Sequence, residues 1–270
     1  GDGLKYSDSE WAEFSYTAEE TVNAGYNEDG YLFRLLEDGT GYMVSSGQVD
    51  IFETEKIILP DYFKGLPVKR IRAGGFSNYN PDYDLDNPNY IPSPDPYTES
   101  YCNHVTRYVK LPAYLEVIEE WAFAGTLLLE EIDLPDSLVE MGEKAFYGCK
   151  KLDNITMPGK IKNIERIYSE CEDDYLPSAF FGGTSHSLKK VKFTTVVDFD
   201  IVGRVAQSQN FQVAANDPKY KSVDGMIYTK NGRTLVGIPY GRKKIAISDK
   251  CTAVSTKSYW YGIETQWKWG

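Results

Sequence analysis

The chain has 270 residues, of which 41% are hydrophobic and 14% are aromatic, enough apolar side chain to build a folded protein. Its 40 acidic and 29 basic residues give a formal net charge of −11, and no block of Lys and Arg interrupts this balance, so nucleic acid and anionic membranes are excluded as expected partners. No run of about 18 apolar residues occurs, and we therefore expect no membrane span.

Residues 1–56 are expected to form an N-terminal cap. The first 28 residues are polar with scattered aromatics, and Ser9–Phe14 has the composition of a short helix. From Gly30 to Ser45 the pattern is that of a β-hairpin, because apolar side chains alternate on both sides of a turn at residues 37–41. We expect this hairpin to cover the first repeat, whose core and strand edge would otherwise be exposed. The alternating residues are Tyr31, Phe33, Leu35, Tyr42 and Val44.

Residues 109–149 contain the same apolar pattern twice, with every matched pair of residues 23 positions apart. A period in the range of about 20 to 29 residues is typical of a leucine-rich solenoid, in which each coil buries its apolar face against its neighbours. The first copy consists of Val109, Leu111, Leu115, Ile118, Ala122 and Phe123, and the second of Ile132, Leu134, Leu138, Met141, Ala145 and Phe146. We expect Phe123, Phe146 and Phe180 to stack in one column of the core.

The pattern extends over most of the chain with interruptions. Upstream, one coil starts at Ile57 and ends at Gly75 and Phe76; downstream, a third coil starts at Ile155, and its Ala-Phe pair is delayed to Ala179 and Phe180. The spacing returns at residues 188–193 and again at residues 245–259. We therefore predict a repeat region over residues 57–262, with insertions at about 77–104, 166–177 and 198–240, followed by a tail at 263–270.

The first insertion is the strongest candidate for a binding loop. Residues 78–97 hold five of the 13 prolines and four tyrosines. Prolines stiffen a loop, and tyrosines offer a large amphipathic contact area at low entropic cost. A structural or mobile loop is the alternative interpretation. The candidate binding residues in this loop are Tyr79, Tyr83, Tyr90 and Tyr97.

No catalytic or metal site is predicted. Asp82, Asp84 and Asp86 resemble the start of a calcium loop, but Ser93 occupies the position of the bidentate glutamate and no glycine marks the bend. The two histidines, His104 and His186, sit in no recognisable nucleophile or metal motif. We expect no enzyme activity and no cofactor.

The four cysteines lack the close spacings of zinc or dithiol sites. Cys149 and Cys251 occupy repeat positions, where we expect buried thiols. Cys102 and Cys171 both lie in insertions, and whether they form a disulfide stays open.

Successive Leu-Pro, Leu-x-x-Ile and Ala-Phe-x-Gly-Cys elements between residues 109 and 158 resemble the BspA-type leucine-rich repeats of bacterial surface proteins. Residues 216–236 are similar to the hairpin insert of that family, and Leu36–Thr40 and Gly65–Val68 resemble its first coil and N-terminal hairpin. The resemblance implies an α/β solenoid, a right-handed superhelix of coils of about 23 residues with a parallel sheet on its inner face and short helical turns opposite. It also implies an extracellular or cell-surface location, reached through a signal peptide absent from this chain.

Within each coil, period-two alternation predicts which side chains leave the core. Ile132 and Leu134 point inward, so Glu131 and Asp133 lie on the exposed face of the sheet. This face is either a solvated surface or a binding surface. Its candidate binding residues are Tyr108, Lys110, Glu131, Asp133, Asn154, Thr156, Lys190 and Lys192, and Lys56 and Ile58 lie on the same face.

The function implied by the resemblance is adhesion or recognition outside the cell, with a host matrix protein or another surface protein as partner and the chain expected to be a monomer. One alternative is a carbohydrate-binding protein that uses the tyrosines of the 79–97 loop and the terminal residues Trp260, Trp267 and Trp269. We favour a cover over the last coil for those tryptophans, because the repeat pattern ends at about Gly262, where a cap is needed. Another alternative is a structural spacer in a surface layer.

Overall fold

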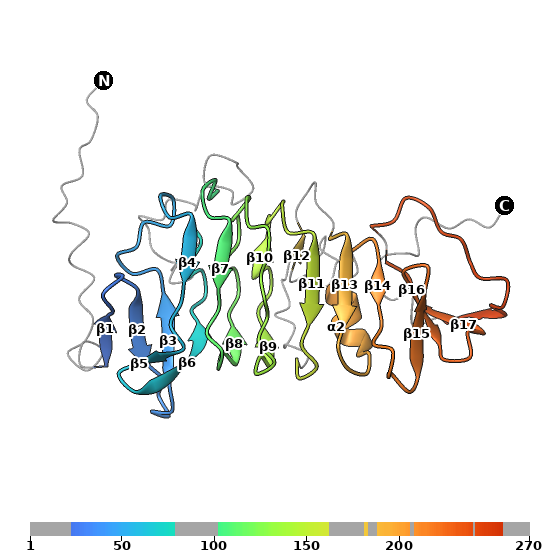
Figure 1. Ribbon diagram of the computed structural model, residues 1–270, viewed down its shortest axis with the longest axis horizontal. Coiled ribbons are helices and arrows are strands. Elements are labelled where there is room, and N and C mark those ends of the chain that lie inside the picture. Colours follow the sequence, from blue (N-terminus) through green and yellow to red (C-terminus); the bar gives the residue numbers. More distant parts are fainter. Residues whose placement is uncertain are drawn as a thin grey trace, which may run out of the picture.

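The computed structural model describes residues 23–78, 102–161, 181–182, 188–205, 208–239 and 241–255. The expected helix at Ser9–Phe14, the tyrosines of the 79–97 loop and the terminal tryptophans lie outside these residues. The chain forms a sheet-rich repeat fold, in which successive repeats follow one another along the long axis of the molecule (Figure 1). Within the described residues, no helix is long and apolar enough to cross a membrane.

The predicted N-terminal hairpin is confirmed. Strand β2 (Leu32–Leu35) pairs with β3 (Tyr42–Ser45) in antiparallel register, and Phe33 and Val44 are fully buried between this hairpin and the rest of the core. A further strand that the sequence did not suggest, β1 (Ala24–Tyr26), pairs with the outer edge of β2. Strand β3 then pairs in parallel with β6 (Leu66–Ile71), so the hairpin continues directly into the repeats.

Parallel pairing between repeats continues this sheet and builds three others. In the sheet that starts at the hairpin, β6 also pairs with β8 (Val117–Ile118), which pairs with β9 (Glu140–Met141). Strand β5 (Tyr62–Phe63) adds to β6 through a tight turn at Lys64 and Gly65, both with positive φ. The sheets are connected by turns, because each repeat is too short for a longer element.

Two further parallel sheets carry the positions predicted to face solvent. One contains β4 (Lys56–Ile58) and β7 (Tyr108–Lys110), with a single bridge from Tyr108 to Glu131. The other contains β11 (Asn154–Met157), β13 (Lys190–Phe193) and β14 (Phe211–Gln212). A separate short pair is formed by β10 (Phe146–Tyr147) and β12 (Phe181–Gly182), which lie parallel.

An aromatic column runs through the core. Phe76 stacks on Phe123 with ring centroids 5.2 Å apart, and Phe123 stacks on Phe146 at 5.4 Å, with ring planes within 11° and 8° of parallel. The predicted stacking of Phe123 and Phe146 is confirmed. Phe180, the third predicted member, lies outside the described residues, and the parallel register places Phe181 opposite Phe146.

The short helical turns predicted opposite the sheet are wrong for the described repeats. The residue before each Ala-Phe or Gly-Phe pair has positive φ, namely 60° at Gly74, 56° at Trp121 and 56° at Lys144. A left-handed residue interrupts a right-handed helix, so these segments are turns. Within the described residues, the one α-helix is α2 (Phe199–Arg204), in the predicted third insertion.

The predicted hairpin at residues 216–236 is confirmed. Strands β15 (Tyr220–Val223), β16 (Met226–Thr229) and β17 (Thr234–Gly237) form an antiparallel meander, and β17 pairs in parallel with β18 (Ala253–Val254). Ile247 lies in the range where the repeat spacing returns, but it is not part of the core. Its side chain is 47% exposed, because residues 244–248 form no strand and join no sheet there.

Candidate functional site

The strand pairings bring the predicted outward residues into register. Lys56 lies beside Tyr108, which lies beside Glu131; Ile58 lies beside Lys110. All eight predicted residues of this face are exposed, whereas the residues between them along the strands are buried. We call these ten positions the ladder face. They are Lys56, Ile58, Tyr108, Lys110, Glu131, Asp133, Asn154, Thr156, Lys190 and Lys192.

The second half of the ladder face is built by β11 and β13. Asn154 lies beside Lys190, and Thr156 lies beside Lys192, with Gln212 of β14 on the far side of Lys192. The alternation is strict here, since Ile155, Met157, Val191 and Phe193 are all buried. Branched and aromatic side chains facing inward therefore fix which polar groups face outward.

The charges of the ladder face differ in whether they have partners. Lys110 Nζ lies 3.7 Å from Asp61 Oδ1, which also accepts a hydrogen bond from the backbone N–H of Ala113. By contrast, five charged side chains have no hydrogen bond or ion pair within the described ranges. Their charges are available to a ligand. They are Lys56, Glu131, Asp133, Lys190 and Lys192.

A pair of tyrosines next to the ladder face was missed by the sequence reasoning. Tyr62 and Tyr114 are 51% and 47% exposed, and their ring centroids are 5.1 Å apart. The hydrogen bond between their side chains, together with slight burial, raises the pKa of Tyr62. A signal was present in the sequence, because each tyrosine follows the proline of a Leu-Pro element by two residues.

A buried polar network fixes the point where the first insertion returns to the repeats. Asn103, only 3% exposed, donates from Nδ2 to the carbonyl oxygen of Ile51 at 2.7 Å and to Thr106 Oγ1 at 2.8 Å. Its Oδ1 accepts from the backbone N–H groups of Val105 and Thr106. The network thus holds the chain just before β7, and so positions Tyr108 and Lys110.

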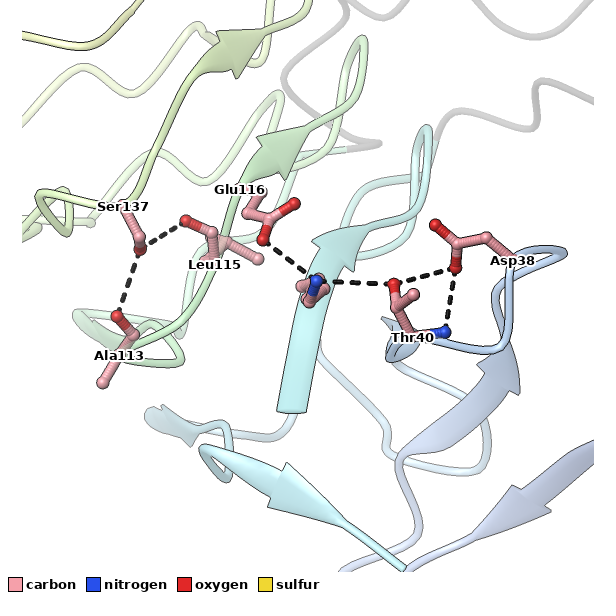
Figure 2. A network of polar contacts seen from close by, with 7 residues as sticks. Asp38, Thr40, Ala113, Leu115, Glu116 and Ser137 are labelled. Atoms are coloured by element: carbon pink, nitrogen blue, oxygen red, sulfur yellow. Dashed lines mark hydrogen bonds and ion pairs between the residues drawn. The ribbon is translucent and has the colours of Figure 1, made fainter. Parts of the chain in front are cut away.

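The sheet that starts at the hairpin carries a different kind of polar surface (Figure 2). Lys69 Nζ lies 3.1 Å from Glu116 Oε1 and 3.4 Å from Thr40 Oγ1, and Ser137 Oγ lies within hydrogen-bond distance of the carbonyl oxygens of Ala113 and Leu115. These groups satisfy one another across neighbouring repeats. They tie coils together, whereas the unpaired charges of the ladder face do not.

The described cysteines differ in how deeply they are buried. Burial raises the pKa of the Cys149 thiol to about 12, so this thiol is unreactive at neutral pH and packs in the core as predicted. Cys251 is half-buried, so its predicted full burial is wrong; it lies at the last described repeat, where fewer neighbours cover it. Cys102 is buried, and Cys171 lies outside the described residues.

The described residues contain no cluster of titratable side chains that could hold a metal ion. Within the described ranges, no three His, Cys, Asp or Glu side chains lie close enough together to hold a metal ion. His104 is exposed, and His186 lies outside those ranges. Burial, followed by the charges of Glu143 and Glu119, raises the pKa of Glu120.

The family model for the BspA type leucine rich repeat region matches residues 96–196 in six copies. Residues 96–196 belong to the BspA-type leucine-rich repeat family. The matched BspA-type region contains eight of the ten ladder-face residues, and only Lys56 and Ile58 precede it. Family membership implies a protein-interaction or adhesion module. No curated protein sequence matches the chain.

Solved structures of bacterial leucine-rich repeat proteins are similar to this chain at low sequence identity. A leucine-rich repeat protein from Bacteroides capillosus is 17% identical, with 54% of this chain and 89% of that chain covered and a TM-score of 0.39. The pneumococcal vaccine antigen PcpA is 14% identical, with 87% and 61% covered and a TM-score of 0.43. A leucine rich cell surface protein from Faecalibacterium prausnitzii is 17% identical, with 87% and 67% covered and a TM-score of 0.36.

Proposed function

We propose that the chain is an extracellular protein-binding module of a bacterial surface protein, without catalytic activity, and that the ladder face binds the partner. In this proposal the coils form a right-handed solenoid that the β1–β3 sheet caps, and a host matrix protein or another surface protein is the partner. One observation carries the proposal. The ladder face presents exposed polar side chains in register on successive strands, and five of its charges have no partner within the described residues.

The geometry of the ladder face suits a macromolecule. Neighbouring strands lie about 4.8 Å apart, and alternate residues along a strand lie about 6.7 Å apart, so the outward groups form a regular grid. A grid that extends over several strands distributes contacts over a protein-sized footprint, whereas a small ligand needs a concave site that surrounds it. Family membership of residues 96–196 supports the same class of function.

The test is a capture screen of the purified chain against extracellular-matrix and bacterial surface proteins at low and high salt. Surface charges are screened by salt, so we expect capture at low salt that weakens as salt rises. A variant with Glu131, Asp133, Lys190 and Lys192 all changed to Ala should lose capture. The matched control changes Glu28, Glu53, Lys243 and Lys244, two exposed acids and two exposed bases outside the ladder face, to Ala. Equal loss in both variants would contradict the proposal.

Glycan binding is a second candidate, favoured by the exposed pair of Tyr62 and Tyr114. Two tilted aromatic rings beside the Asp61 carboxylate offer apolar faces and a hydrogen-bond acceptor, the combination that a sugar ring uses. Binding to a glycan array that persists at high salt and disappears in Tyr62→Ala and Tyr114→Ala would establish it. Binding that both variants retain would exclude this site.

A further inference from the structure

The unpaired charges of the ladder face that flank β11 have opposite sign on its two sides; the remaining one, Lys56, lies at the end of the face on β4. On one side, β13 carries Lys190 and Lys192 beside Asn154 and Thr156. On the other side, the preceding repeat carries Glu131 and Asp133, each 23 residues before Asn154 and Thr156, and a backbone hydrogen bond from Lys151 to Leu127 links the two repeats. Strand β11 itself carries no charge on this face, since its outward residues are Asn154 and Thr156.

This arrangement is complementary to itself. A two-fold axis parallel to β11, placed over the ladder face, turns a second copy face to face with the first and exchanges the two sides of β11. Lys190 then lies opposite the second copy's Glu131, and Lys192 lies opposite the second copy's Asp133. The symmetry repeats both pairs, which gives four ion pairs between copies.

Residues on and beyond this charged centre fit the same symmetry. Asn154 and Thr156 lie on the axis opposite their own counterparts, where neutral side chains with both donors and acceptors can pair. Further out, Lys110 lies opposite the second copy's Gln212, which is exposed and uncharged. None of these opposed positions brings like charges together, so the pattern favours this partner and this orientation.

We propose that the partner of the ladder face is a second copy of this chain, bound face to face with the repeat axes antiparallel. This inference rests on the proposed function, because it names the partner of the same surface. In place of the monomer expected from the sequence, it proposes a monomer in equilibrium with a dimer.

The size of the face sets the strength of this contact. Six strands of about three residues each cover on the order of 300 Å² per copy, well below the roughly 800 Å² per partner of a stable complex. The contact between two isolated copies is therefore weak and depends on salt. Many copies on facing surfaces would strengthen it through multivalency.

The test is sedimentation velocity of the full chain over a range of concentrations at about 30 mM and 500 mM salt, where screening lengths differ severalfold. We expect reversible dimers at low salt that dissociate at high salt. Two variants place like charges opposite each other across the axis when each pairs with itself. The acidic variant is Lys190→Glu with Lys192→Glu, and the basic variant is Glu131→Lys with Asp133→Lys. Each alone should raise the dimer dissociation constant at least tenfold, and an equimolar mixture of the two should restore the dimer.

A matched pair of variants separates this geometry from general charge attraction. Lys243→Glu with Lys244→Glu and Glu28→Lys with Glu53→Lys make the same charge changes at exposed sites outside the ladder face. Each should dimerise as the wild type does, and their mixture should associate no more tightly than the wild type. A wild-type chain that stays monomeric at low salt, or ladder-face variants that match these controls, would overturn the inference. Capture of a different protein by a monomeric wild type would leave the proposed function standing.

Discussion

Phe123 stacks on Phe146 with their ring planes 8° from parallel and their centroids 5.4 Å apart. The two residues are 23 positions apart, so the contact joins equivalent points of successive repeats. Phe76 extends the column on the other side of Phe123. A single coil in this fold is too small to bury its apolar side chains by itself. In this column, each coil buries its phenylalanine against the phenylalanine of the next coil.

Removing the middle ring should therefore destabilise the repeats on both sides. We expect Phe123→Ala to lower the free energy of unfolding by about 3–5 kcal/mol, because Phe123 is fully buried and both stacking partners lose contact. Urea denaturation followed by circular dichroism measures it. Tyr114→Ala, at a half-exposed position, should change the same quantity by less than about 0.5 kcal/mol. A loss below about 1 kcal/mol for Phe123→Ala would show that the column is dispensable.

Much of this fold is local pattern, which is why the sequence predicts it. The alternation of Glu131, Ile132 and Asp133 already separates exposed from buried positions, and the Asp224-Gly225 pair marks the turn between β15 and β16, where both residues have positive φ. Repeats 23 residues apart then place equivalent residues side by side. The exposure of the ladder face follows from these two rules.

Features that depend on contacts outside the repeat were missed. Asn103 reaches Ile51, 52 residues earlier, and neither residue belongs to the repeated pattern. The positive φ of Trp121 and Lys144 also has no signal in the sequence, since both residues favour right-handed backbone. The opposed charges on the two sides of β11 became apparent only once Asn154 was known to lie beside Lys190.

Replacement of Asn103 tests the polar network at the end of the first insertion. Asn103→Ala leaves the backbone N–H groups of Val105 and Thr106 without their acceptor and removes a donor to the carbonyl of Ile51. We expect it to lower the free energy of unfolding by about 2–4 kcal/mol, because buried polar groups without partners are costly. Asn154→Ala, at an exposed position of the ladder face, is the control. A similar small effect in both variants would argue against the network.

Lys144 tests the left-handed turn. At φ 56°, a β-branched residue is strongly disfavoured. Lys144→Val also loses the contact of Lys144 Nζ with the Trp121 ring, whose centroid lies 4.8 Å away. Together these effects should lower the free energy of unfolding by about 1–3 kcal/mol. Lys144→Gly relieves backbone strain while losing the same contact, and should stay within about 1 kcal/mol of wild type. The same two substitutions at the exposed residue Lys151, which has no positive φ, provide the comparison. Valine as stable as glycine at position 144 would contradict this account.

Asp217 makes stability depend on pH. Its side chain is 2% exposed; burial alone would raise its pKa, but hydrogen bonds from the backbone N–H groups of Lys219, Tyr220 and Val197 and the charge of Lys230 outweigh burial and lower it. A lowered folded-state pKa contributes stability above the unfolded value of about 3.9, and this is lost as pH falls through the folded pKa.

We therefore expect Asp217→Asn to lower the free energy of unfolding by about 1–3 kcal/mol at pH 7 and to approach wild type below about pH 3. Urea denaturation at a series of pH values measures the difference, and Asp136→Asn, at an exposed site, is the control. A difference that stays constant from pH 7 to pH 3 would show that the charge of Asp217 is not involved.

The central claim is that the ladder face binds a protein, and oxidative footprinting of the chain alone and with its captured partner tests it most directly. Tyr108 lies on the ladder face and Tyr26 lies on β1 outside it, and both are exposed, so each is oxidised in the free chain. Our account predicts that the partner protects Tyr108 from oxidation and leaves Tyr26 unprotected. Protection of Tyr26 with Tyr108 still oxidised at its free rate would contradict it.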